Sequence, residues 1–317
     1  MNKAILHDHL DGGLRPSTAL ELAKKDNYRP LIEVDDITKF FDRSKSDSLE
    51  DYLEAFIHTT ALMNSYENLE RIAFEAAEDM SSNGISLYES RYAPLYSVNS
   101  TLSIKNVIDA INSGFKQAEN LYGIRSGLIL CGMRNDKENV KKVGEIAIEY
   151  KNLIIGFDIA GPELNYRPSL FKETFKKVKE EGINITIHAG EGDGVESIKD
   201  ALKNGAQRIG HGVRIIEDIN LENNNMGEVA TYIHKNHVPL EICVSSNIHT
   251  NMYESIEKHP IKELIKLDFN VSINTDNRLM SNTEINKEMT NCYYALGIEL
   301  EVFEKLLFKS ASYSFLN

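Results

Sequence analysis

The sequence predicts an α/β fold, a closed (β/α)8 barrel of the TIM type with extra helices inserted after the first strand. Two observations predict it. Short apolar segments alternate with long amphipathic segments along the chain, as expected where helical crossovers join parallel strands. The alternation repeats about eight times, which suits a closed barrel better than an open sheet. We therefore expect one barrel domain over residues 1–317.

The expected strands are short apolar runs with the length of buried strands. They cover Ala4–Asp8, Ile85–Tyr92, Ser126–Met133, Leu153–Ile159, Ile183–His188, Arg208–His211, Leu240–Val244 and Asn270–Asn274. Clear helices between them include Ser103–Leu121 and Ser169–Glu181, the second opened by Pro168 and followed by Gly182, a common helix stop. The tail Glu299–Asn317 predicts an amphipathic helix that packs on the barrel.

The segment between the first two strands is far longer than a crossover needs. It contains a predicted helix over Ser17–Lys25, with Ser17 as a plausible N-cap, and a longer helical pattern over Leu49–Met80. Helices inserted after a barrel strand lie at the catalytic mouth, so we expect this segment to form a pocket wall or lid. The alternative is barrel decoration without a functional role.

The charge balance argues against a nucleic-acid partner. Acidic residues outnumber basic residues by 48 to 35, which gives a formal net charge of −13. A polyanion would be repelled by that field, and no cluster of Lys and Arg offsets it. The sequence therefore favours a small-molecule substrate, and no obligate protein partner is evident.

Cysteine usage and the start of the chain indicate a cytoplasmic protein. Cys131, Cys243 and Cys292 are far apart and form no CxxC pair, which argues against a disulfide framework. Residues 1–7 lack the apolar stretch of a signal peptide, and no window is apolar enough for a membrane span.

Five side chains that can bind a metal or a proton follow the ends of predicted strands. His7 and His9 end the first strand, His188 ends the fifth, His211 ends the sixth and Asp276 follows the eighth. Reactive residues of such barrels come from the C-terminal ends of the strands. We therefore expect these five side chains to share one rim.

The pair His7 and His9 predicts a metal site. Their spacing of two residues on a strand places both imidazoles on one face, with Asp8 on the other. Together with His188 and Asp276 they make a donor set that suits one Zn²⁺ per chain, with an open position for water. An isolated His-x-His can also be a pair of ordinary surface or core histidines. The remaining histidines are expected at the surface or as caps: His58, His234, His237, His249 and His259.

Five motifs in order resemble those of the adenosine deaminase family, part of the metal-dependent amidohydrolase superfamily. The resemblance runs from residue 5 to about residue 280, and Arg91-Tyr92-Ala93-Pro94 also fits it. The motifs are His7-Asp8-His9-Leu10-Asp11-Gly12, Asp158-Ile159-Ala160-Gly161, His188-Ala189-Gly190-Glu191, Arg208-Ile209-Gly210-His211-Gly212 and Asn274-Thr275-Asp276-Asn277. Each motif alone is weak, whereas the ordered set is specific.

The resemblance implies a zinc-dependent hydrolase in which water attacks C6 of adenosine or 2′-deoxyadenosine and ammonia leaves. It assigns the metal to His7, His9, His188 and Asp276. Glu191 would deliver a proton to purine N1, which requires a raised pKa. His211 would hold and help activate the water.

The resemblance also implies the substrate contacts. Gly161 would contact N3 through its backbone, and Asp11 would hydrogen-bond the ribose 5′-hydroxyl. Asn277 would lie near N7, where part of the family has Asp; an amide donates to N7 at any pH. Leu53 and Phe56 resemble the apolar wall over the substrate, although their spacing fits ordinary core equally well.

Two other functions stay open. Asp11 would repel a 5′-phosphate and thus favour nucleosides over AMP. However, a barrel with this metal site can also deaminate adenine or a modified adenine nucleoside. A catalytically inactive metal-binding protein is the second alternative.

Overall fold

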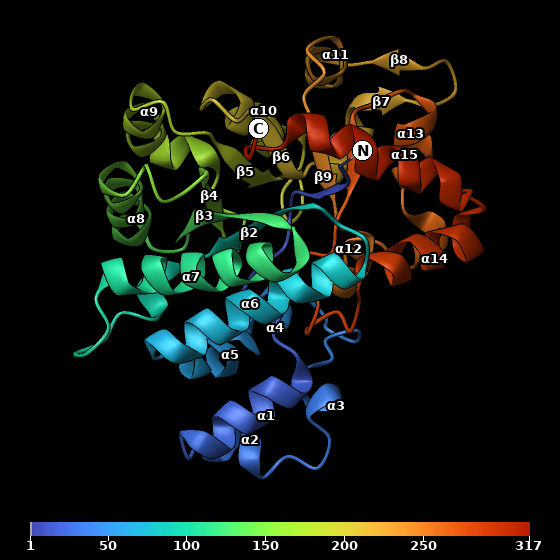
Figure 1. The fold of residues 1–317 in the computed structure, drawn as a ribbon. Coiled ribbons are helices and arrows are strands. Elements are labelled where there is room, and N and C mark those ends of the chain that lie inside the picture. The colour runs from blue at the N-terminus through green and yellow to red at the C-terminus, as the bar shows by residue number, and fades with distance from the viewer. Residues whose placement is uncertain (1) are drawn as a thin grey trace.

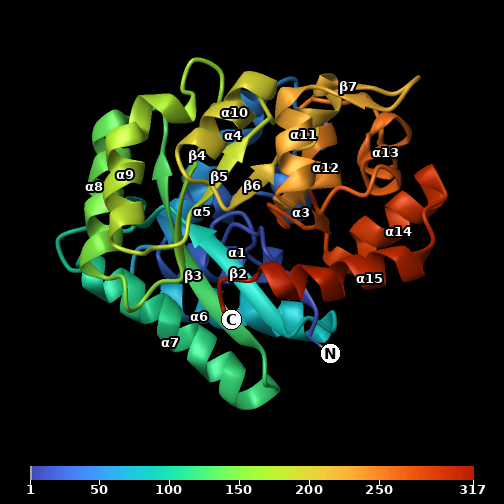
Figure 2. The ribbon, with the colours of Figure 1, turned by 90° about the horizontal axis from the view of Figure 1, so that it is seen from above.

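Parallel strands form the centre of the structure, a computed structural model that describes residues 2–317 (Figure 1). The strands that build this centre are β1 Ala4–Ile5, β2 Leu87–Tyr92, β3 Arg125–Met133, β4 Gly156–Ala160, β5 Thr186–Ala189, β6 Arg208–His211, β9 Leu240–Ile242 and β10 Val271–Ile273. Each overlaps a predicted strand, with ends shifted by a few residues. Viewed from above, the helices lie around these strands (Figure 2).

The strands form two sheets that two isolated bridges join into a barrel. Their orders are β1-β2-β3-β4 and β10-β9-β6-β5, with every pair parallel. Phe157 pairs with Ile185 between β4 and the approach to β5, and Asp8 pairs with Asp276 just beyond β1 and β10. The predicted barrel is therefore confirmed, and its closure next to Asp276 lies at the expected catalytic end.

The segment inserted after β1 consists of helices and the loops that connect them, as predicted. The bounds of these helices differ from the predicted bounds. The helices are α1 Pro16–Lys25, α2 Arg29–Ile32, α3 Ile37–Phe41, α4 Leu49–Leu53, α5 Phe56–Leu62 and α6 Tyr66–Ser82. The prediction of Ser17 as an N-cap is wrong, because α1 begins at Pro16, whose fixed φ suits the first helical turn, and Arg15 is the capping residue. The pattern over Leu49–Met80 is divided among α4, α5 and α6.

The other helices mostly cover the outside of the barrel (Figure 2). They are α7 Ile104–Tyr122, α8 Lys137–Glu149, α9 Lys172–Glu180, α10 Val195–Lys203, α11 Glu228–Lys235, α12 Val244–His249, α13 Ile261–Lys266, α14 Ile285–Leu296 and α15 Leu300–Ser310. Ser103 caps α7 through its hydroxyl, and Gly123 ends that helix in the left-handed conformation. The helix predicted from Ser169 begins as a short 3-10 turn, and its α-helical part starts at Lys172.

The chain end after α15 lies against the end of the barrel opposite the catalytic rim. Ser314 and the backbone of Phe315 both donate to Glu89 near the start of β2. Glu89 in turn pairs with Arg208 at the start of β6. The predicted packing of the tail on the barrel is thus confirmed.

A short antiparallel hairpin, β7 Ile219–Asn220 with β8 Asn225–Met226, lies outside the barrel. Within residues 2–317, no helix combines the length and the apolar character that crossing a membrane requires.

Candidate active site

A cavity of about 950 Å³ opens at the C-terminal ends of the strands. Every residue predicted for the site lines this cavity except His7, which is fully buried beneath it. The lining residues from that prediction are His9, Asp11, Leu53, Phe56, Gly161, His188, Glu191, His211, Asp276 and Asn277. Residues of α4 and α5 form one wall, so the inserted helices do border the pocket.

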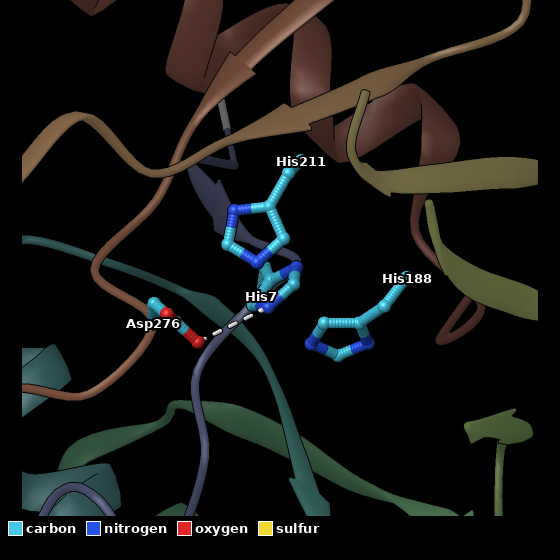
Figure 3. A group of neighbouring side chains, drawn as sticks. All are labelled: His7, His188, His211 and Asp276. Atoms are coloured by element: carbon cyan, nitrogen blue, oxygen red, sulfur yellow. Dashed lines mark ion pairs between the residues drawn. The ribbon is translucent and has the colours of Figure 1, made fainter. Parts of the chain in front are cut away.

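Three of the predicted metal ligands, His7, His188 and Asp276, converge at the base of this cavity together with His211 (Figure 3). His7 Nε2 lies 3.2 Å from Asp276 Oδ1, and His9 Nε2 lies 3.4 Å from the same oxygen. His9 Nε2 is also 3.1 Å from His188 Nε2. Zinc bonds of about 2.0 to 2.2 Å bring neighbouring ligand atoms to within roughly 3 to 3.5 Å of one another, which matches these separations. His7 Nε2 and Asp276 Oδ1 are buried without hydrogen-bond partners, so the donor set fits a divalent cation.

His211 also lies close to this group. The ligand-capable atoms of His7, His188, His211 and Asp276 all lie within 4.8 Å of one another. The structure thus brings both histidines to the metal position, and the choice of His9 as ligand with His211 beside it stays a proposal.

Two buried carboxylates orient the ligand rings. Glu241 Oε2 lies 3.0 Å from His7 Nδ1, and Asp158 Oδ2 lies 2.9 Å from His188 Nδ1. Arg91 joins them, pairing with Asp158 at 2.7 Å and with Glu241 at 2.9 Å. Carboxylates in this position fix the ring orientation and direct Nε2 towards a metal.

Sequence reasoning assigned no role to these carboxylates. The signal was present, because Asp158 and Glu241 are acidic residues inside otherwise apolar strands. Glu241 is fully buried yet ionised: burial alone would raise its pKa, but Arg91 and Arg208 hold the pKa well below its ordinary value.

Two of the reactive side chains are carried on left-handed backbone directly at the strand ends. His211 has φ 58° and Asp276 has φ 59°. This conformation is uncommon for residues other than glycine and is held only where the surrounding structure fixes it. Gly161 has φ 96°, which a glycine adopts freely, and it lines the cavity after β4.

Glu191 is buried in the loop after β5. Glu163 fixes that loop, because its carboxylate accepts hydrogen bonds from the backbone N–H groups of Gly190, Glu191 and Asp193 at 2.8, 2.9 and 3.1 Å. Burial raises the pKa of Glu191 well above its ordinary value, and the carboxylates of Asp276 and Glu163 raise it further. A protonated Glu191 is therefore favoured, as an acid catalyst requires.

The pKa of Asp276 is shifted in the opposite direction. Burial alone would raise the pKa of its carboxyl, but the neighbouring imidazoles of His7 and His9 hold that pKa well below its ordinary value. The two carboxyl groups facing the same cavity therefore differ in protonation, one acid and one anion.

The residues predicted for the substrate reach the cavity in different ways. Asp11 is buried, and its Oδ1 has no hydrogen-bond partner. Burial raises the pKa of Asp11 to about 7, so its carboxylate is less strongly ionised than the sequence argument assumed. Asn277 Oδ1 is also unpartnered and packs directly against Gly12.

Several lining residues were not predicted. One of them is Tyr52, which is buried and whose hydroxyl lies 2.8 Å from Ser281 Oγ. Two of the histidines expected at the surface or as caps have a further place in the structure. His58 borders the cavity, and His259 is buried, with 2% of its surface exposed. Packing between distant helices puts these side chains in place, and no local pattern could have revealed it.

Known proteins match this chain along its whole length. The family model for adenosine deaminase matches residues 2–317. Adenosine deaminase 1 of Streptomyces coelicolor is 42% identical, over 94% of this chain and 78% of that protein. The structure of an adenine deaminase from Arthrobacter aurescens superposes with a TM-score of 0.89 at 20% identity, covering 99% of this chain and 93% of that one. An amidohydrolase from Burkholderia ambifaria, solved with bound Zn, has a TM-score of 0.86 at 20% identity, with coverages of 100% and 86%. The two structural matches concern the fold.

Proposed function

We propose, from the premise that this chain belongs to the adenosine deaminase family, that it deaminates adenosine and 2′-deoxyadenosine by hydrolysis. The products would be inosine or 2′-deoxyinosine and ammonia. The observation that carries the proposal is the convergence of a metal-competent donor set, a buried acid with a raised pKa and His211 in one cavity.

We infer that His7, His9, His188 and Asp276 hold one zinc ion. When bound, zinc would supply a water molecule with a pKa of about 7, and thus a nucleophile at neutral pH. Glu241 and Asp158 support this assignment, because their carboxylates lie 3.0 and 2.9 Å from Nδ1 of His7 and His188, on the side of each ring away from Nε2.

Glu191 acts as the acid. Attack at C6 pushes electron density into the purine ring, and a proton delivered to N1 accommodates it. The raised pKa of Glu191 keeps that proton available, and the Glu163 carboxylate holds the loop in place through three backbone hydrogen bonds. His211 Nε2 lies 3.6 Å from Glu191 Oε2, so both face the same reacting centre.

The remaining contacts select the substrate. The unpartnered Oδ1 of Asp11 is an acceptor suited to the ribose 5′-hydroxyl. Asn277 would donate to N7, and the backbone of Gly161 would contact N3. Leu53 and Phe56 would cover the base from the inserted helices. We also infer a cytoplasmic enzyme, because its three cysteines are free and buried.

A substrate panel tests this function. Ammonia release is measured with the zinc-loaded enzyme on adenosine, 2′-deoxyadenosine, adenine, AMP and guanosine. We expect kcat/KM on the two adenine nucleosides to exceed that on AMP and adenine by about a hundredfold or more. Adenine lacks the ribose 5′-hydroxyl that would donate to Asp11, and AMP carries a phosphate in its place. Turnover of adenine alone would replace the proposal with the adenine alternative, and no turnover of the two nucleosides would refute it.

A further inference from the structure

A buried chain of hydrogen bonds reaches His211 from the side away from the cavity. Asn247 Nδ2 lies 3.1 Å from His211 Nδ1, and Asn247 Oδ1 lies 3.2 Å from His259 Nε2. The backbone N–H of Ile261 donates to His259 Nδ1 at 3.2 Å. Asn247 lies on α12, and His259 lies two residues before α13, so these hydrogen bonds join His211, at the end of β6, to two later segments.

The donor and acceptor roles along this series of hydrogen bonds are fixed by the last bond, from Ile261 to His259. A backbone N–H can only donate, so His259 Nδ1 must accept and carries no proton. The proton of a neutral His259 is then on Nε2, which donates to Asn247. Asn247 must therefore present its oxygen to His259 and its NH2 group to His211.

The same logic sets the state of His211. An amide NH2 donates, so His211 Nδ1 must be the acceptor, and the ring proton lies on Nε2. That nitrogen faces the reaction centre, 3.6 Å from Glu191 Oε2. Figure 3 shows one ring nitrogen of His211 turned towards His7 and Asp276 and the other turned away.

We propose that Asn247 and His259 are positioning residues that hold His211 as its Nε2–H tautomer, so that His211 donates a hydrogen bond to the attacking oxygen. This role rests on the proposed deaminase function. In this state Nε2 has no free lone pair, so His211 cannot accept the proton of the attacking water at that atom. His211 therefore orients the oxygen, and the ionised Asp276 carboxylate must take the proton.

Burial makes the chain hard to replace by water. Asn247 and His211 are 0% and 1% exposed, and His259 is 2% exposed. Tyr253 packs edge-on against the His259 ring, with ring centroids 5.1 Å apart. Burial also lowers the pKa of His259 to about 3, in agreement with a neutral ring. Loss of any one member would leave a buried polar group without a partner.

Nuclear magnetic resonance tests the tautomer directly. The zinc-loaded enzyme is labelled with ¹⁵N-histidine, and the His211 signals are assigned by their absence from His211→Gln. The ¹⁵N shifts distinguish a protonated from an unprotonated ring nitrogen. We expect only Nε2 to be protonated in the unmodified protein, and Nδ1 to become protonated in Asn247→Asp, where an acceptor replaces the donor. Protonation of Nδ1 in the unmodified protein would overturn the proposal.

Kinetics provide the second readout. Asn247→Asp keeps the shape of the side chain but reverses the hydrogen bond to His211, so kcat should fall about 100-fold with little change in KM. His259→Gln can still accept from Ile261 and donate to Asn247, and should stay within about threefold, whereas His259→Leu should lose about tenfold or more. Equal losses in the two His259 variants would show that only packing matters, and would refute the proposed positioning of His211 by Asn247 and His259.

Asn270→Asp is the matched control. Asn270 is another buried asparagine, which donates to the His237 carbonyl before β10 and at the opposite end of the barrel. It should lose stability without a selective fall in kcat. The tautomer is measured without substrate, so it can be determined even if the unmodified protein fails to deaminate nucleosides. Failure of the proposed deaminase function is therefore distinguishable from failure of the proposed positioning of His211.

Discussion

Replacing Asp158 with asparagine should weaken zinc binding by changing which nitrogen of His188 carries the proton. Asp158 Oδ1 accepts from the backbone N–H groups of Ile159 and His188 at 2.7 and 3.1 Å, and an amide oxygen can keep both bonds. Asp158 Oδ2 faces Arg91 Nη1 at 2.7 Å and His188 Nδ1 at 2.9 Å. In Asp158→Asn, the NH2 group would point at both. His188 Nδ1 would then have to accept, which places the ring proton on the metal-facing Nε2.

The size of the effect follows from these contacts. Loss of a carboxylate that orients a metal-binding histidine costs about 10- to 100-fold in metal affinity, or about 1.4 to 2.7 kcal/mol. The free energy of unfolding should also fall, by about 3 kcal/mol, since one partner of a buried ion pair is removed. Arg91 retains Glu241 and the Leu6 carbonyl, which keeps the loss at the lower end of the range for such pairs.

Competition with a zinc chelator measures the affinity of the purified variant. Asp218→Asn serves as the control, because Asp218 accepts from the backbone of Val229 and Ala230 at the start of α11 and touches no proposed ligand. Its zinc affinity should equal that of the unmodified protein. If folded Asp158→Asn binds zinc within twofold of the unmodified protein, the orienting role of Asp158 is refuted.

Three further predictions concern the acid, the N7 contact and His259. Glu191→Gln cannot supply a proton, so kcat on adenosine should fall about 10²- to 10⁴-fold at unchanged zinc content; a fall below tenfold would contradict the acid role. Gly12→Ala would place a methyl group 2.0 Å from Asn277 Oδ1, so it should displace that side chain and lower kcat/KM on adenosine about tenfold; unchanged kinetics would exclude an N7 contact from this position. Burial lowers the pKa of His259 from 6.5 to about 3. The unfolded chain therefore binds the extra proton between these pH values, and stability falls as the pH drops below 6.5. Between pH 7.5 and pH 5 this group should account for about 2 kcal/mol of lost unfolding free energy, and denaturant titrations of His259→Gln should lack that part of the loss.

The barrel could be predicted from the sequence because its strands are short, buried and separated by clear helices. The side chains that gather at the rim follow those strands directly, so local position alone predicted that His7, His188 and His211 would lie together. The inserted helices were harder to delimit. Ser65 caps α6 through its hydroxyl, which separates α6 from α5 inside one continuous helical pattern.

The supporting groups of the site could not be found in the same way. Glu241 bonds His7 across 234 residues of sequence, Asn247 reaches His211 across 36 residues, and His259 reaches Asn247 across 12. No hydrophobic period or short motif encodes such contacts. His259 was expected at the surface or as a cap; packing buries it, and its Nδ1 accepts from Ile261, the first residue of α13.

Zinc titration into the metal-free protein, with ammonia release from adenosine as the readout, tests the central claim most directly. We expect no turnover without metal and a linear rise that ends at one zinc per chain, because His7, His188 and Asp276 belong to a single donor group, with His9 and His211 beside it. Turnover that is independent of zinc, or a zinc-loaded protein that releases no ammonia from adenosine, would contradict it.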